Sequence, residues 1–289
     1  MDWPTFIQSI ANALVMGSIY ATIAVGLALA FGVMQMANFA HGELFMSGAY
    51  VVYVLYALGG FPFPVAVLLA FPIVAAMGVV TEKFIFRPTR GNVLAGFMAT
   101  GGLAFILQVS VGQLWGVGLM RSVPTPYMGA ASILGAQVSW QRLLIFPVTV
   151  VMVTGLWFFL HRVRLGKGLR ACAQDAEAAS LQGININKMT ALSMAISGGF
   201  AGVAGALMAP IHAVTPYMGH QIIITAFIVV IVGGMASIEG AILAAFILGF
   251  IHTFVTTLFD AVVATMAGVM FMAVILVVKP TGLLGRVRM

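Results

Sequence analysis

Long apolar runs without charged residues dominate the hydrophobic pattern of this chain. Residues 3–42, 44–81 and 189–238 contain no Asp, Glu, Lys or Arg. A membrane-spanning helix needs about 20 apolar residues, so each run can hold one or two spans. A transmembrane β-barrel would instead alternate apolar and polar residues over strands of about ten residues. The pattern therefore predicts an all-α, polytopic integral membrane protein.

Polar and glycine- or proline-rich interruptions divide these runs into about nine spans, with a range of about eight to ten. Clear interruptions occur at residues 210–220, near residues 237–240 and at Asp260. The expected spans are residues 6–34, 42–58, 64–82, 93–118, 143–161, 189–209, 221–236, 241–258 and 261–278. Short spans broken by Gly and Pro are common around substrate pathways. We treat residues 1–289 as a single transmembrane domain.

The positions of the basic residues predict how the chain is oriented. Lys and Arg near span ends are retained on the cytoplasmic side. Eleven of the thirteen form three clusters: Lys83, Arg87 and Arg90; then Arg162, Arg164, Lys167, Arg170 and Lys188; then Lys279, Arg286 and Arg288. If all three clusters are cytoplasmic, an even number of spans must separate them. With three spans before the first cluster, the N-terminus is then expected outside and the C-terminus in the cytoplasm. The net charge of +6 then belongs to cytoplasmic loops and requires no nucleic-acid partner.

Composition agrees with a membrane protein, because only 7% of the residues are charged and 62% are hydrophobic. Ordinary soluble domains contain about 25% charged residues. The exception is the polar segment at about residues 164–188, which is Ala-rich and of mixed charge. It predicts one cytoplasmic helix over residues 169–182, about 20 Å long, that stops at Gly183 in the left-handed conformation. A helix of this kind can fit a groove on a soluble partner.

Two segments place polar residues where the bilayer would penalise them. Asn38, His41 and Glu43 lie within six residues between the first two spans. A charged carboxylate at bilayer depth costs about 2.5–3.5 kcal/mol, so such groups usually face protein or a wet cavity. One interpretation is a cytoplasmic interfacial turn with Asn38 as a helix cap. The other is a structured element beside the translocation pathway.

The second polar segment, residues 210–221, faces outward on the predicted topology. It is either a plain external loop or part of the outer mouth of the pathway. Its candidate pathway residues are Thr215, Tyr217 and Gln221.

Small residues recur at helical spacing after residue 197. Gly198 and Gly202, like Ala201 and Gly205, are separated by three residues, which lets helix backbones approach closely. Gly233 and Gly234 are expected to serve the same packing role. Tight helix packing is therefore the interpretation of these glycines.

Several chemistries are disfavoured by spacing. The five histidines include no pair three or four residues apart, so a metal site on one helix is not expected. Gly166-Lys167 imitates a phosphate-binding loop, but residue 161 is His and residue 168 is Gly where that motif needs Gly and Ser or Thr. The chain therefore cannot hydrolyse ATP itself. A proton-coupled carrier usually has carboxylates deep within spans, whereas Glu43, Glu239 and Asp260 lie near predicted span ends.

The order of short motifs along the chain resembles one family of transport proteins. The motifs are Asn38-Phe-Ala-His41-Gly-Glu43, Gly168-Leu-Arg170-Ala-Cys172-Ala-Gln-Asp175, Ala179-Ser-Leu-Gln-Gly183-Ile-Asn185, Thr215-Pro-Tyr217-Met-Gly219, Gly233-Gly234-Met-Ala-Ser237 and Pro280-Thr-Gly282-Leu-Leu-Gly285. They resemble the membrane subunits of bacterial ABC importers for branched-chain amino acids, in particular the first of two paired permeases. The chain departs from the family pattern at Ala236, commonly glycine, and at Glu239, commonly proline.

The resemblance implies a permease that is not an enzyme and acts in the bacterial inner membrane. Its implied partners are a second similar permease, two cytoplasmic ATPases that bind ATP and Mg, and a periplasmic solute-binding protein. No cofactor is implied in this chain. Glu177-Ala178-Ala179 followed by Gly183 fits the EAAxxxG pattern of importer coupling loops. The implied ATPase-coupling residues are Gly166, Arg170, Asp175, Glu177, Ala178, Ala179 and Gly183.

The implied cargo is a branched-chain or other small neutral amino acid. Members of the same superfamily that are similar to this chain carry urea or short amides, which is the first alternative. An ion-coupled carrier or channel is the second alternative, and a membrane enzyme is the third.

Overall fold

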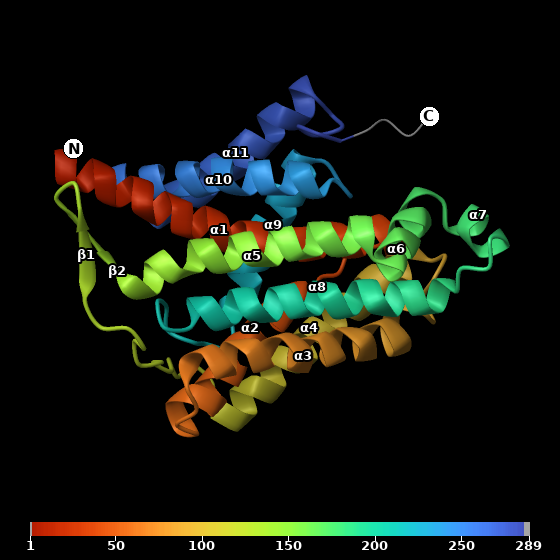
Figure 1. The fold of residues 1–289 in the computed structure, drawn as a ribbon, viewed down its shortest axis with the longest axis horizontal. Helices are drawn as coiled ribbons and strands as arrows, with labels where there is room; N and C mark the ends of the chain where they lie inside the picture. Colours follow the sequence, from red (N-terminus) through yellow and green to blue (C-terminus); the bar gives the residue numbers. More distant parts are fainter. Residues whose placement is uncertain (1, 286–289) are drawn as a thin grey trace.

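The computed structural model describes residues 2–285, which form a bundle of long helices (Figure 1). The helices are α1 (Trp3–Met34), α2 (His41–Val52) with the π-helix η1 (Tyr53–Leu58), α3 (Phe63–Thr81) with the π-helix η2 (Glu82–Phe86), α4 (Val93–Trp115), α5 (Trp140–Arg162), α6 (Arg164–Gln174), α7 (Ala176–Leu181), α8 (Ile186–Met208), α9 (Met218–Gly233), α10 (Ile238–Leu258) and α11 (Ala261–Val278). Seven helices of the described part are long and apolar enough to cross a membrane.

The predicted helical membrane protein is confirmed, and each expected span coincides with a helix to within a few residues. Two of these helices are not among the seven: α2 with its π-helical extension, which begins with the polar residues His41 and Glu43, and the shorter α9, which ends at Gly233 rather than at residue 236. The all-α prediction missed a hairpin of β1 (Ala130–Ile133) and β2 (Ala136–Ser139). Its turn residues Leu134 and Gly135 both have positive φ, 49° and 90°. Asn-Gly is the usual sequence signal for such a turn. Leu134 stands where that signal has Asn, so the sequence pattern did not predict the turn.

The two most enclosed long helices, α1 and α8, form the centre of the bundle. Their most apolar windows are 83% and 78% buried, whereas those of α4 and α11 are each 11% buried. Helix α1 packs against α8 and α10, and α3 packs against α8 (Figure 1). The bare faces of α4 and α11 therefore suit contact with lipid or with another apolar protein surface.

The two ends of the bundle differ in the basic residues and in the chain segments that lie there. The start of α1 lies at one end, and α6 and α7 lie at the other (Figure 1). Arg90 donates a 2.7 Å hydrogen bond to Asn187, so the first two basic clusters share the α6–α7 end. Leu283 N–H donates to the Val232 carbonyl oxygen at 2.7 Å, which brings the segment after α11 to the end of α9. Arg286 and Arg288, which complete the third cluster, lie outside the described residues.

Glycines let α8 approach α2 and α3 at backbone contact. A Cβ added at Gly198 would lie 2.7 Å from the Val74 carbonyl oxygen, and one at Gly205 would strike the backbone of Phe45. One at Gly202 would lie 2.7 Å from Val74 Cβ. Gly233 and Gly234 lie elsewhere, at the end of α9. There they leave room for the backbones of residues 240 and 285.

Ala236 has a left-handed backbone with φ of 73°. A non-glycine residue pays about 1–2 kcal/mol for this conformation, so glycine suits the position better. We expect Ala236→Gly to stabilise the protein by about 1 kcal/mol and to raise the thermal unfolding midpoint in detergent. Ala76→Gly, at an exposed position inside α3, should lower that midpoint. A lower midpoint for Ala236→Gly would contradict the expectation.

Candidate functional site

The polar segment between α5 and α8 folds into two helices, not the single predicted helix over residues 169–182. Helix α6 ends at Gln174 and α7 begins at Ala176, because Asp175 is extended, with φ −156° and ψ 109°. The Asp175 Oδ1 atom accepts the backbone N–H groups of Glu177 and Ala178, both at 2.9 Å. This local bond offers the backbone an alternative to a continuous helix. Asp175, inside the predicted helix, was the residue in the sequence that could have indicated this break.

Helix α6 is anchored and α7 is largely free. Gly166 lies so close to Phe159 and Leu160 of α5 that a side chain there would collide with their backbone. Leu169 and Cys172 are buried, whereas Arg170 is exposed. On α7, Ala179 is buried and Glu177 and Ala178 are exposed. The predicted left-handed stop at Gly183 is confirmed by its φ of 79°.

His41 lies deep inside the bundle. Its ring is fully buried, and Nε2 donates to the Ile23 carbonyl oxygen at 3.1 Å. In the neutral ring, Nδ1 then accepts from the Ser197 hydroxyl at 3.4 Å. Ile23 lies well inside α1 and Ser197 near the middle of α8. The first residue of α2 is therefore at about mid-depth, and α2 does not start at the end of the bundle.

Glu43, in the first turn of α2, is also buried at mid-depth. Its Oε1 atom accepts from the Gln108 side-chain amide at 2.8 Å. Its Oε2 atom lies 2.8 Å from the point that a Cβ on Gly219 would occupy, so it lies against the first turn of α9. Helix N-termini carry free N–H groups and a partial positive charge, which favour a nearby carboxylate. The α2 and α9 N-termini meet here, since Gly42 and Gly219 are in backbone contact.

Asn38 does not cap α2. The N-cap residue is Ala40, and the Asn38 Oδ1 atom accepts its N–H at 3.1 Å in a local turn. Asn38 is 1% exposed and Glu43 2% exposed, so the exposed interfacial turn is the wrong alternative. Asn38 Nδ2 and Glu43 Oε2 are buried without a protein hydrogen-bond partner among the described residues. Buried polar atoms in this state call for a partner such as water or a polar solute.

The second polar segment leads into α9. Val214 pairs with Arg121 through two backbone hydrogen bonds of 2.8 and 2.9 Å, which tie the segment to the loop after α4. Thr215 is half-buried, and Tyr217 and Gln221 are exposed. The structure brings none of these three into the Glu43 contacts. The neighbouring Gly219 is the residue that reaches Glu43.

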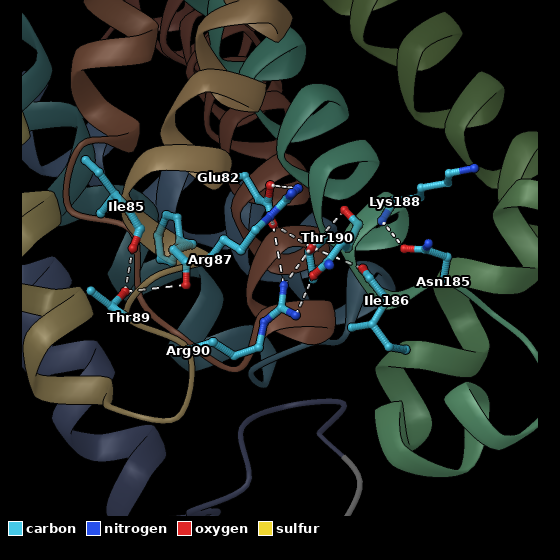
Figure 2. Close-up of polar contacts among 11 residues, drawn as sticks. Glu82, Ile85, Arg87, Thr89, Arg90, Asn185, Ile186, Lys188 and Thr190 are labelled. Atoms are coloured by element: carbon cyan, nitrogen blue, oxygen red, sulfur yellow. Dashed lines mark hydrogen bonds and ion pairs between the residues drawn. The ribbon is translucent and has the colours of Figure 1, made fainter.

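An ion-pair network around a buried carboxylate lies at the α6–α7 end, and sequence reasoning did not identify it (Figure 2). Glu82 is 0% exposed and pairs with Arg87 at 2.8 Å and with Arg90 at 3.5 Å. The Thr190 hydroxyl donates to Glu82 Oε1 at 2.8 Å. The network therefore joins the α3–α4 turn to the first turns of α8. In the sequence, both arginines indicated only orientation, although a Glu five and eight residues before them was a usable signal.

The described residues bear on metal chemistry and on carrier chemistry in different ways. They include no group of three or more His, Cys, Asp or Glu side chains placed to hold a metal ion. Glu239 lies in the first turn of α10, and Asp260 caps α11 by accepting two backbone N–H groups. Glu43 differs from its predicted position near a span end, because the six non-helical residues between α1 and α2 lead the chain back to mid-depth.

Comparison with known proteins gives consistent matches over nearly the whole chain. The family described as "Branched-chain amino acid transport system / permease component" matches residues 9–279. The chain is 34% identical to the high-affinity branched-chain amino acid transport system permease protein BraD of Pseudomonas aeruginosa, over 97% of this chain and 96% of BraD. It is 31% identical to LivH of Escherichia coli, a permease protein with the same description, with the same shares covered.

A solved structure shares the fold. PsaBC from Streptococcus pneumoniae, in complex with Fab, matches 93% of this chain and 91% of the compared chain with a TM-score of 0.54. The sequence identity is 14%, so the likeness concerns the fold alone.

Proposed function

The chain belongs to the permease components of branched-chain amino acid transport systems, and from this premise we propose how it works. It carries a branched-chain amino acid through the bacterial inner membrane as one half of a permease pair. Two cytoplasmic ATPases bind ATP and Mg and drive the pair, and a periplasmic solute-binding protein delivers the cargo. The observation that supports this proposal is α7, a short helix with an exposed face at one end of an otherwise apolar bundle.

Uptake into vesicles tests the proposal. The chain is purified with its co-expressed partner subunits and reconstituted with the binding protein, and radiolabelled leucine uptake is measured. We expect uptake only with ATP on the ATPase side, no effect of a protonophore, and competition by isoleucine and valine. Competition by urea or acetamide instead would favour the amide alternative. Uptake without ATP that a protonophore abolishes would favour the carrier, for which the depth of Glu43 is the specific support.

We place the translocation pathway beside the meeting point of α2 and α9. Asn38, His41 and Glu43 supply polar groups there, and Gln108 adds an amide from α4. Discontinuous helices with N-termini at mid-depth commonly form substrate sites in transporters. Thr215, Tyr217 and Gln221 belong, in this proposal, to the outer approach to that point.

Glu43→Gln should reduce leucine flux about two- to tenfold, because it exchanges a charge-assisted hydrogen bond, worth about 1.5–3 kcal/mol net, for a neutral one, worth about 0.5–1.5 kcal/mol. Flux is normalised to assembled complex, and basal ATPase activity should persist. Glu239→Gln makes the same change at an exposed carboxylate and should alter flux by less than about twofold. Equal flux in both variants would remove Glu43 from the pathway.

Orientation can be tested at α7, where we expect the cytoplasm. Cys172 is a poor probe, because it is 1% exposed and burial raises the pKa of its thiol. We therefore expect an impermeant thiol reagent to leave Cys172 unmodified until the protein is denatured. In a Cys172→Ala background, Ser180→Cys is exposed and should be labelled in inside-out vesicles only. Labelling in intact cells with a permeabilised outer membrane would reverse the orientation.

A further inference from the structure

An apolar groove runs along the outside of the bundle between α3 and α5, with α8 as its floor. Its volume is about 760 Å³, within the range of about 300–1,000 Å³ typical of ligand pockets. All residues that line it are apolar, glycine or proline; they include Leu68, Phe71, Val151, Gly155, Phe159 and Leu192. A groove of this composition can bind a hydrocarbon chain, and its side chains supply no hydrogen-bond partner for a polar solute.

The groove follows the direction in which the bundle crosses the bilayer. On α5 it is lined from Leu144 to Phe159, a distance of about 22 Å at 1.5 Å per residue. The hydrocarbon core of a bilayer is about 30 Å thick, so one leaflet contributes about half of that. The groove is therefore long enough to hold an acyl chain that enters from one leaflet.

Two cations stand at the α6–α7 end of the groove. Arg162 follows Phe159 by three residues on α5, and Lys188 precedes Leu192 by four on α8. Residues at these spacings share a helix face. Both cations are exposed, and neither side chain makes a hydrogen bond or ion pair with another of the described residues 2–285. Figure 2 shows the Lys188 side chain extending away from the Glu82 network.

We propose that the groove binds an anionic phospholipid of the adjacent leaflet, with an acyl chain along α5 and the phosphate between Arg162 and Lys188. The charge distribution selects this occupant, because an apolar channel with cations at one end is complementary to an apolar chain with an anionic head. A transmembrane helix of a second copy or of a partner permease would leave both cations unpaired unless it carried matching acids. The bound lipid would also contact the start of α6, the helix that leads to α7.

A photo-cross-linker identifies the occupant directly. Val151 lines the groove and is 70% exposed, so a benzoylphenylalanine placed there reports what lies against α5. The assembled complex is irradiated in native membranes and analysed by mass spectrometry. We expect an adduct with the mass of a phospholipid. An adduct with a second copy of the chain, or with another protein, overturns the proposal.

Headgroup selectivity is measured by native mass spectrometry after reconstitution in vesicles of equal phosphatidylglycerol and phosphatidylethanolamine. We expect retained phosphatidylglycerol in wild type and an affinity about thirtyfold lower in Arg162→Gln/Lys188→Gln, since each cation near an anionic headgroup contributes about fivefold. Lys279→Gln removes one cation at the end of α11, remote from the groove, and should change retention little. Equal retention of both lipids, or no loss in the double variant, overturns the proposal.

Filling the groove gives a second, independent control. A Cβ on Gly155 would meet no atom within 4 Å, so Gly155→Leu inserts a side chain into the groove without a backbone clash. It should abolish retention of phosphatidylglycerol while the complex still assembles. Gly102→Leu makes the same substitution on α4, also in open space, and should retain the lipid. Retention by Gly155→Leu equal to that of Gly102→Leu would show that the lipid binds elsewhere.

Discussion

Removing both arginines that pair with Glu82, in the variant Arg87→Ala/Arg90→Ala, is expected to destabilise the protein by about 3–5 kcal/mol. The two arginine side chains are 38% and 42% exposed, whereas Glu82 is completely buried. Without the arginines the carboxylate keeps only the Thr190 hydroxyl as a partner among the residues that the structure describes. An uncompensated buried charge costs more than the pair itself contributes.

The asymmetry of burial gives this prediction its control. Glu82→Gln leaves the two cations half-exposed and able to bind water, so it should cost about 1–2 kcal/mol. Added to the double variant, Glu82→Gln should recover part of the lost stability, because it replaces a buried carboxylate that has no cationic partner with a neutral amide. Lys83→Ala removes an exposed cation of the same turn and should change stability by less than about 0.5 kcal/mol. Denaturant unfolding in detergent measures all four variants, and a double variant no worse than Glu82→Gln would contradict the argument.

Sequence patterns predicted the membrane helices well because hydrophobicity and charge act locally. A run such as residues 189–209 must be helical in lipid, where every backbone group needs an internal partner, and α8 spans Ile186–Met208. This requirement for internal hydrogen bonds does not determine at which depth of the bundle a helix begins or ends. For that reason α2 was placed as a full span, although it starts at mid-depth beside Ile23.

Pairing across the fold was the part that the sequence could not supply. Glu43 and Gln108 are 65 residues apart, and Glu82 and Thr190 are 108 apart. No local period links such residues, since their contacts depend on how separate helices pack. The broken helix at Asp175 is a different case. There a local rule, the preference of Asp for an N-cap, competed with the helix propensity of the surrounding alanines and determined the outcome.

Gly183→Pro is expected to lower ATP-driven leucine uptake at least tenfold while the complex assembles and basal ATPase activity continues. Gly183 has φ of 79° and its N–H donates to the Ser180 carbonyl oxygen at 2.9 Å. Proline fixes φ near −65° and has no N–H, so α7 cannot end in its present form. Glu177→Lys/Ala178→Asp should act similarly by changing the exposed face of α7. Both expectations rest on the proposal that α7 docks on an ATPase.

Gly183→Ala separates a changed helix end from a merely destabilised loop. Alanine keeps the N–H group and can adopt the left-handed conformation at a cost of about 1–2 kcal/mol. It should therefore retain most of the uptake that the proline variant loses. Uptake and ATP hydrolysis are measured in the same vesicles, because only their ratio reports coupling. Wild-type uptake per assembled complex in the proline variant would show that coupling to the ATPase does not depend on the shape of α7. An equal loss of uptake in the alanine variant would attribute the effect to lower stability of the loop.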